Sequence, residues 1–73
     1  MTEGVVAERV VAPGSKSERR AVVLETAGGD LVLRRRGANP FKDPELEALV
    51  GRRIRAAGDV RGNTLIMDGW EEL

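Results

Sequence analysis

The sequence contains no cysteine, histidine or tyrosine, and its only aromatic side chains are those of Phe41 and Trp70. Without cysteine there can be no disulfide, no thiolate metal site and no nucleophilic thiol. Without histidine the usual general base and the commonest neutral metal ligand are absent as well. We therefore expect a protein that is not an enzyme, carries no cofactor and binds no metal.

The charges of the chain balance, with twelve lysines and arginines against twelve acidic residues. No net field therefore draws the protein to nucleic acid or to an anionic membrane. The balance is uneven along the chain, because residues 34–61 hold eight basic and four acidic side chains. No run resembles a signal peptide or could span a bilayer, so we expect a soluble, cytoplasmic bacterial protein with no membrane partner.

Short apolar runs rich in β-branched residues alternate with breaks that contain glycine, which is typical of a small all-β domain. The breaks include a turn at residues 27–30, where glycines give the backbone the positive φ angles that tight hairpins need. A second turn falls at residues 62–63, and residues 71–73 form a frayed tail. The pattern predicts strands over residues 4–12, 19–26, 31–36, 52–61 and 64–70.

One helix signal interrupts the strands. Asp43 is a suitable N-cap and Pro44 fits the first helical position. An apolar stripe at the spacing i, i+3, i+4 begins at Leu46, and Gly51 ends the pattern. The sequence predicts a helix over residues 44–50, which is so short that it must dock on the strands to persist.

Alternation along the predicted strands separates an inner from an outer face. The inner positions and the helix stripe supply the side chains that we expect to be buried: Val22, Leu24, Leu33, Leu49, Ile54 and Val60. The outer positions of the second and third strands supply a small exposed apolar patch: Ala21, Val23 and Val32.

The element order is three strands, one helix and two strands. Residues 46–68, LEALVGRRIRAAGDVRGNTLIMD, resemble the helix, glycine-ended cap and final hairpin of many small OB domains. The resemblance covers nearly the whole chain and rests on topology. It implies a single all-β domain over residues 1–73, a five-stranded OB-type Greek-key barrel with one short helix between strands 3 and 4. An SH3-like barrel is the structural alternative, although it usually lacks a helix at this point.

The most conspicuous string is PGSKS at residues 13–17, followed by Arg20. It is similar to the phosphate-binding segment near the start of enolpyruvyl-transfer enzymes. The arginine lies one residue closer here, and those enzymes need two large domains. Two interpretations remain: a plain connection between the first two strands, or a loop that contacts an anion, since this loop commonly borders the ligand groove in OB domains.

Three consecutive arginines occupy the end of the third predicted strand. Arg34 and Arg36 project from one face, whereas Arg35 points the opposite way. In OB domains the face formed by strands 2 and 3 usually holds the ligand. The residues expected to bind a ligand are Lys16, Arg20, Val23, Val32, Arg34 and Arg36. The alternative is a solvated strand face whose arginines pair with nearby glutamates.

Arginines on such a face would contact phosphates, which makes single-stranded nucleic acid the first ligand to consider. Bases stack on aromatic side chains, and this chain has only two. Binding would therefore be weak, electrostatic and sensitive to salt. The alternative is a protein–protein interaction or scaffold module that uses the apolar patch or an open strand edge.

Overall fold

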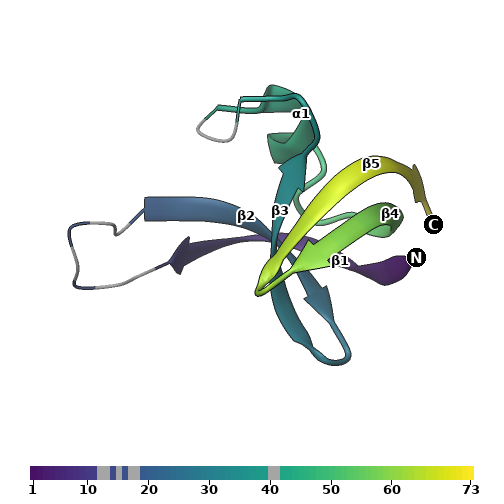
Figure 1. Ribbon diagram of the computed structural model, residues 1–73, viewed down its shortest axis with the longest axis horizontal. Coiled ribbons are helices and arrows are strands. Elements are labelled where there is room, and N and C mark those ends of the chain that lie inside the picture. The colour runs from purple at the N-terminus through teal and green to yellow at the C-terminus, as the bar shows by residue number, and fades with distance from the viewer. Residues whose placement is uncertain (12–13, 15, 17–18, 40–41) are drawn as a thin grey trace.

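In the computed structural model, the described residues, 1–11, 14, 16, 19–39 and 42–73, form five strands and one short helix (Figure 1). Their order matches the order expected from the sequence. The elements are β1 (Thr2–Val11), β2 (Arg19–Thr26), β3 (Gly29–Arg35), α1 (Pro44–Glu47), β4 (Arg53–Arg61) and β5 (Thr64–Glu72).

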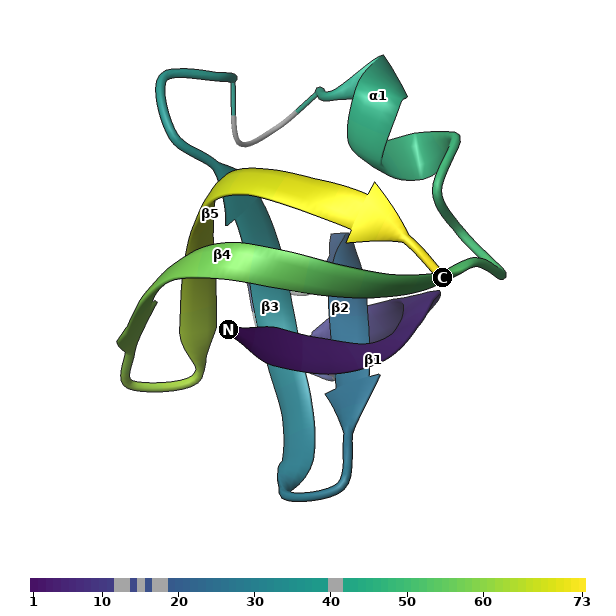
Figure 2. The ribbon, with the colours of Figure 1, turned by 90° about the vertical axis from the view of Figure 1, so that its right-hand side faces the viewer.

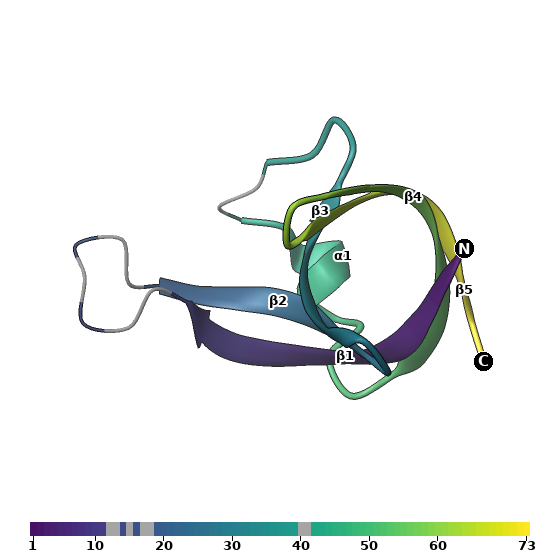
Figure 3. The same cartoon turned by 60° about the horizontal axis from the view of Figure 1, so that its bottom comes forward.

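The strands form one sheet that closes into a ring in the order β1-β2-β3-β5-β4, with β4 returning to β1 (Figure 2). All neighbours are antiparallel except β3 and β5, which run parallel. The core fills the ring and consists of Val6, Leu24, Leu33, Leu46, Leu49, Ile54, Ala56, Leu65 and Met67. Because Leu46 and Leu49 belong to this core, α1 covers one end of the ring (Figure 3).

The predicted hairpin between the second and third strands is confirmed. β2 and β3 pair antiparallel, and Thr26 lies opposite Gly29, which leaves only two residues in the turn. Gly29 has a φ of 123°, a conformation that L side chains rarely adopt. The Thr26 hydroxyl accepts a hydrogen bond from the Gly28 amide at 3.2 Å and donates to the Gly29 carbonyl at 2.6 Å. This tight turn explains why β3 starts two residues earlier than predicted.

The helix is shorter than predicted. α1 ends at Glu47, and the hydrogen bonds beyond it tighten to the i→i−3 pattern, from the Leu49 amide to the Leu46 carbonyl at 3.0 Å. The tighter turn keeps both leucines buried and leaves Val50 exposed. The predicted N-cap is confirmed, because the Asp43 side chain accepts a hydrogen bond from the Leu46 amide.

Most of the predicted core is buried, namely Leu24, Leu33, Leu49 and Ile54. Val22 is only partly buried and packs against that core. The prediction for Val60 is wrong, since its side chain is 52% exposed. The β1–β4 ladder stops at Ala56, so the distal part of β4 has β5 as its only strand neighbour and little covers Val60.

A register shift in the last hairpin was not foreseen. Ala57 lies opposite Gly69, but the next residue, Gly58, lies opposite Met67, which leaves Asp68 as an extra residue in β5. Such a bulge changes the phase of alternation. Met67 follows Leu65 into the core by ordinary alternation, and the extra residue after it brings Trp70 to the same side, where Trp70 packs against the core. The tail is also better ordered than expected, because β5 continues to Glu72 and pairs there with β4.

Candidate functional site

The predicted apolar patch is not exposed. Val23 and Ala21 are only 2% and 7% exposed, and Val32 is half-buried. On the outward face Val23 lies between Ala7 of β1 and Val32 of β3. Val23 and Ala21 therefore offer almost no surface to a ligand, and of the predicted patch only Val32 stays accessible.

The ion pair between Arg9 and Glu25 covers the region around Val23. Arg9 lies two rungs beyond Ala7 and Val23, and Glu25 lies two rungs before them on the same face. The Arg9 guanidinium bonds to the Glu25 carboxylate, so its side chain passes across that rung. It also lies 4.0 Å from Asp30 of β3. The carboxylates of Glu25 and Asp30 thus hold Arg9 over Val23, which was expected to be exposed.

Arg36 projects outward as predicted, but its charge is compensated. Its guanidinium donates to Asp68 and, at 2.9 Å, to Asp59 of β4. The hydrogen bonds to these two carboxylates raise the pKa of Arg36 above its ordinary value. Arg36 therefore ties β3 to β4 and β5, and a phosphate would have to compete with two carboxylates for it.

Arg35 points the other way, as predicted, and holds the helix. Its Nε and Nη2 donate to the two carboxylate oxygens of Asp43 at 2.8 and 2.9 Å, and Nη1 lies 3.1 Å from Glu45. Asp43 is almost buried, and its hydrogen bond from Arg35 is the main reason that the Asp43 pKa lies below its usual range. This cluster is a structural contact between β3 and the start of α1.

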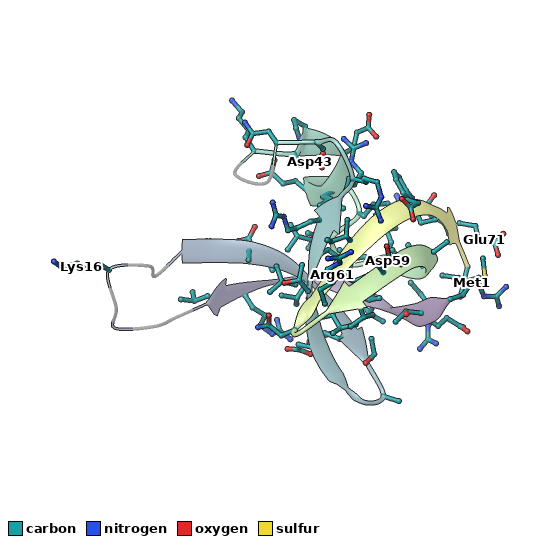
Figure 4. All side chains as sticks on the ribbon, in the orientation of Figure 1. Met1, Lys16, Asp43, Asp59, Arg61 and Glu71 are labelled. Atoms are coloured by element: carbon teal, nitrogen blue, oxygen red, sulfur yellow. The ribbon has the colours of Figure 1, made fainter. Side chains whose placement is uncertain are left out.

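Arg20 and Lys16 belong to a different part of the molecule. The far ends of β1 and β2 extend away from the ring as a two-stranded arm (Figures 1 and 3). Arg20 lies on this arm, 3.1 Å from Glu8, and Lys16 is exposed at its tip, far from Arg61 (Figure 4). The structure therefore does not bring these two residues together with Arg34.

The ion pairs use the acidic side chains unevenly. Four arginines each contact two carboxylates: Arg9, Arg35, Arg36 and Arg55. Two more contact one each: Arg20 and Arg52. Among the side chains that the structure describes, the cations outside these pairs are Lys16, Arg34, Lys42, Arg53 and Arg61, and the acid outside them is Glu47. In the described part of the chain, five cations and one acid thus lie outside the ion pairs, while the pairs themselves join six arginines to ten carboxylates.

Two of these free cations share one face. Arg34 of β3 lies beside Ile66 of β5, and Arg61 of β4 lies opposite Thr64 of β5. Leu33 and Leu65 point into the core, so their sequence neighbours on these strands point outward. Standard strand spacings put the two arginine Cα atoms roughly 12 Å apart, with β5 between them. We call this surface the Arg34–Arg61 face: Val32, Arg34, Asp59, Arg61, Thr64 and Ile66.

Arg61 was not among the residues expected to bind a ligand, because local sequence pattern does not show where the turn at residues 62–63 lies. In the structure the Val32 amide donates to the Asn63 carbonyl at 2.7 Å and holds the turn against β3. The parallel pairing of β3 with β5 then brings Arg61 to the same face as Arg34.

A second feature is an open hollow of about 220 Å³ lined by Met1, Arg55, Ala57, Gly69, Trp70 and Glu71. The hollow lies over β4 and β5 near the N-terminus. Arg55 is held there by Glu3 and Glu71, at 3.8 and 3.1 Å, so the cationic side chain that lines the hollow is compensated. The Arg34–Arg61 face is therefore the better candidate for an anionic ligand.

No helix in the described part of the chain is long and apolar enough to cross a membrane. Within that same part, no three acidic side chains converge as a metal site would require. Comparisons with protein-family models, with curated proteins and with solved structures find no match to this chain.

Proposed function

We propose that the chain is a non-enzymatic OB-fold module that binds single-stranded nucleic acid weakly, through phosphates, at the Arg34–Arg61 face. The ring order supports the fold. Read around the ring, β4, β1, β2 and β3 are neighbours in that order, which is the 4-1-2-3 order of a Greek key. α1 stands between β3 and β4, as the OB arrangement requires and an SH3-like barrel does not.

The presence of two uncompensated arginines on one face is the observation that carries the proposed ligand. Six other arginines are already bonded to carboxylates, whereas Arg34 and Arg61 have no ion pair among the described residues. A guanidinium group offers several donors in a plane and suits a phosphate oxygen pair. OB domains bind oligonucleotides on strands 2 and 3 and on the loop between strands 4 and 5, and these two arginines lie on β3 and beside that loop.

The rest of the face determines the kind of binding. The neighbours of the two arginines are Val32, Thr64, Ile66 and Asp59, whose carboxylate is bonded to Arg36. None of these side chains is an aromatic platform on which a base could stack. Recognition must then rest on the backbone phosphates, without sequence preference. The proposed affinity is low, in the micromolar range or weaker, and falls with added salt.

Fluorescence anisotropy with a labelled oligonucleotide tests the proposal at about 20 and 200 mM salt. We expect Arg34→Ala with Arg61→Ala to weaken binding and to reduce the salt slope by about 1.4, since each phosphate contact on a single strand contributes about 0.7. Arg53→Ala is the matched control, because Arg53 is also exposed, lies on β4 with Arg61 and is free of ion pairs in the described structure.

Three outcomes would contradict the proposal. The first is no binding to single strands at low salt. The second is an equal loss for Arg53→Ala and for the double variant, which would indicate general attraction without a site. The third is stronger binding to a duplex of the same length, which would place the ligand in another class.

A further inference from the structure

The arm formed by β1 and β2 has an open edge. β1 pairs with β4 only over Thr2–Val5, and β2 pairs with β3 only from Val23 onward. Beyond these points, residues 8–11 and 19–22 pair only with each other in the described part of the chain. Figures 1 and 3 show this two-stranded arm extending away from the ring. An unpaired edge of this kind is a template for another strand.

The register shows which backbone groups face outward along β1. The Val6 amide donates to the Arg52 carbonyl at 2.8 Å, and the Val6 carbonyl accepts from the Gly51 amide at 2.7 Å. Val6 therefore directs both groups away from β2. Alternate residues of a strand direct their backbone groups to the same side. Glu8 and Val10 thus present their amides and carbonyls to the open edge. Both residues lie beyond Val6, where Gly51 and Arg52 cover this edge.

The side chains on this part of the arm carry opposite charges and one exposed apolar group. Val10 is 51% exposed and lies opposite Arg20. Glu8 lies on the same face and is 3.1 Å from Arg20. On the other face Arg9 is held by Glu25 and Asp30, and its Nη1 donates to the Glu8 carbonyl at 3.2 Å.

We propose that this edge of β1 pairs antiparallel with the same edge of a second copy of the chain, about a two-fold axis at Arg9. Glu8 of each copy then lies opposite Val10 of the other. Each of these rungs closes with two backbone hydrogen bonds, one of which releases the Glu8 carbonyl from Arg9. Such an interface is isologous, since the same patch serves both copies.

Charge complementarity favours a second copy in this register. Glu8 of the first copy lies beside the exposed Val10 of the second copy. The next side chain across the sheet from that valine is Arg20 of the second copy, whose charge is opposite to that of Glu8. No like charges face each other on that side of the sheet. The two Arg9 side chains meet on the other side, but each is already bonded to its own carboxylates, which lowers the repulsion.

Analytical ultracentrifugation and amide hydrogen exchange test this inference between roughly 0.05 and 2 mM protein, the range suited to a small, weak interface. We expect the wild-type chain to self-associate as concentration rises. The amides of Glu8 and Val10 should become protected at the same time. The amide of Arg9 faces β2 and should be protected at every concentration.

Variants of Val10 test the register. Val10→Glu places a carboxylate opposite Glu8 of the second copy and should weaken self-association at least about fivefold. Val10→Lys places the opposite charge there and should maintain or strengthen it. Val60→Glu is the matched control, because Val60 is equally exposed at 52% but lies on β4, away from the arm, and it should change nothing.

A monomeric wild-type chain at the highest concentration, with unprotected Glu8 and Val10 amides, would overturn the inference. Self-association that is insensitive to Val10→Glu would assign the contact to another surface and overturn it too. Equal weakening by Val10→Glu and Val10→Lys would overturn the register. Protection of the Glu8 and Val10 amides only on addition of an unrelated extended peptide would identify a foreign strand as the occupant in place of a second copy.

Discussion

Arg35 and Asp43 form a two-pronged ion pair in which the guanidinium Nε and Nη2 each donate to a different carboxylate oxygen, at 2.8 and 2.9 Å. Asp43 also caps α1, because its Oδ1 accepts from the Leu46 amide. One carboxylate thus joins the end of β3 to the start of the helix. The two sequence neighbours of Arg35 have different roles. Arg34 has no ion pair among the described residues, whereas Arg36 is bonded to Asp59 and Asp68.

This ion pair predicts an acid-dependent component of stability. The hydrogen bond from Arg35 holds the pKa of Asp43 below its ordinary value of 3.8. A depressed pKa stabilises the folded state above the ordinary value, and that stability is lost as the pH falls through the folded-state pKa. Asp43→Asn keeps a capping side chain but loses the charge. Its free energy of unfolding should lie below that of the wild type at neutral pH and approach it as the pH falls below 3.8 and through the folded-state pKa.

Denaturant unfolding of both proteins between pH 2 and 7 measures this difference, and subtracting the two curves removes the effect of the other carboxylates. Glu45→Gln is the control, because the Glu45 side chain is 65% exposed and its ion pair should contribute little. A difference between wild type and Asp43→Asn that does not vary with pH would contradict the assignment.

The core contacts predict unequal effects at two aliphatic positions that the sequence pattern treats alike. Leu33 is 4% exposed and Val60 is 52% exposed. Leu33→Ala should lower the free energy of unfolding by about 2–5 kcal/mol through the cavity it leaves. Val60→Ala should change it by less than about 0.5 kcal/mol. Thermal and denaturant melts of the two variants measure this, and equal losses would show that the distal part of β4 is buried.

The last hairpin predicts opposite outcomes for two glycines on facing strands. A Cβ on Gly58 would collide with the backbone carbonyl of Ile66, whereas a Cβ on Gly69 would meet no atom within 4 Å. Gly58→Ala should therefore destabilise the fold by about 1–3 kcal/mol, because backbone has to move. Gly69→Ala should be close to neutral. The same melts measure both, and a Gly58→Ala variant as stable as Gly69→Ala would place the register shift elsewhere.

Local sequence determined the elements of this protein. The spacing of Asp43, Pro44 and Leu46 predicts the helix start, because capping depends on groups only three residues apart. The glycines in the predicted turn at residues 27–30 predict the hairpin between the second and third strands for the same reason. The alternation of Leu33 between Val32 and Arg34 likewise predicts its inward direction, since side chains on a strand alternate whatever it packs against.

Tertiary structure decided the candidate site and the limits of the core. Val23 is buried because strands β1 and β3 and the Arg9–Glu25 pair cover it, and that cover comes from residues distant in sequence. Val60 is exposed because β1 stops short of it, although its own alternation points inward. Arg34 and Arg61 share a face only because β3 and β5 run side by side. Which charges remain uncompensated depends on such pairings, since an ion pair forms wherever the fold brings opposite charges within reach.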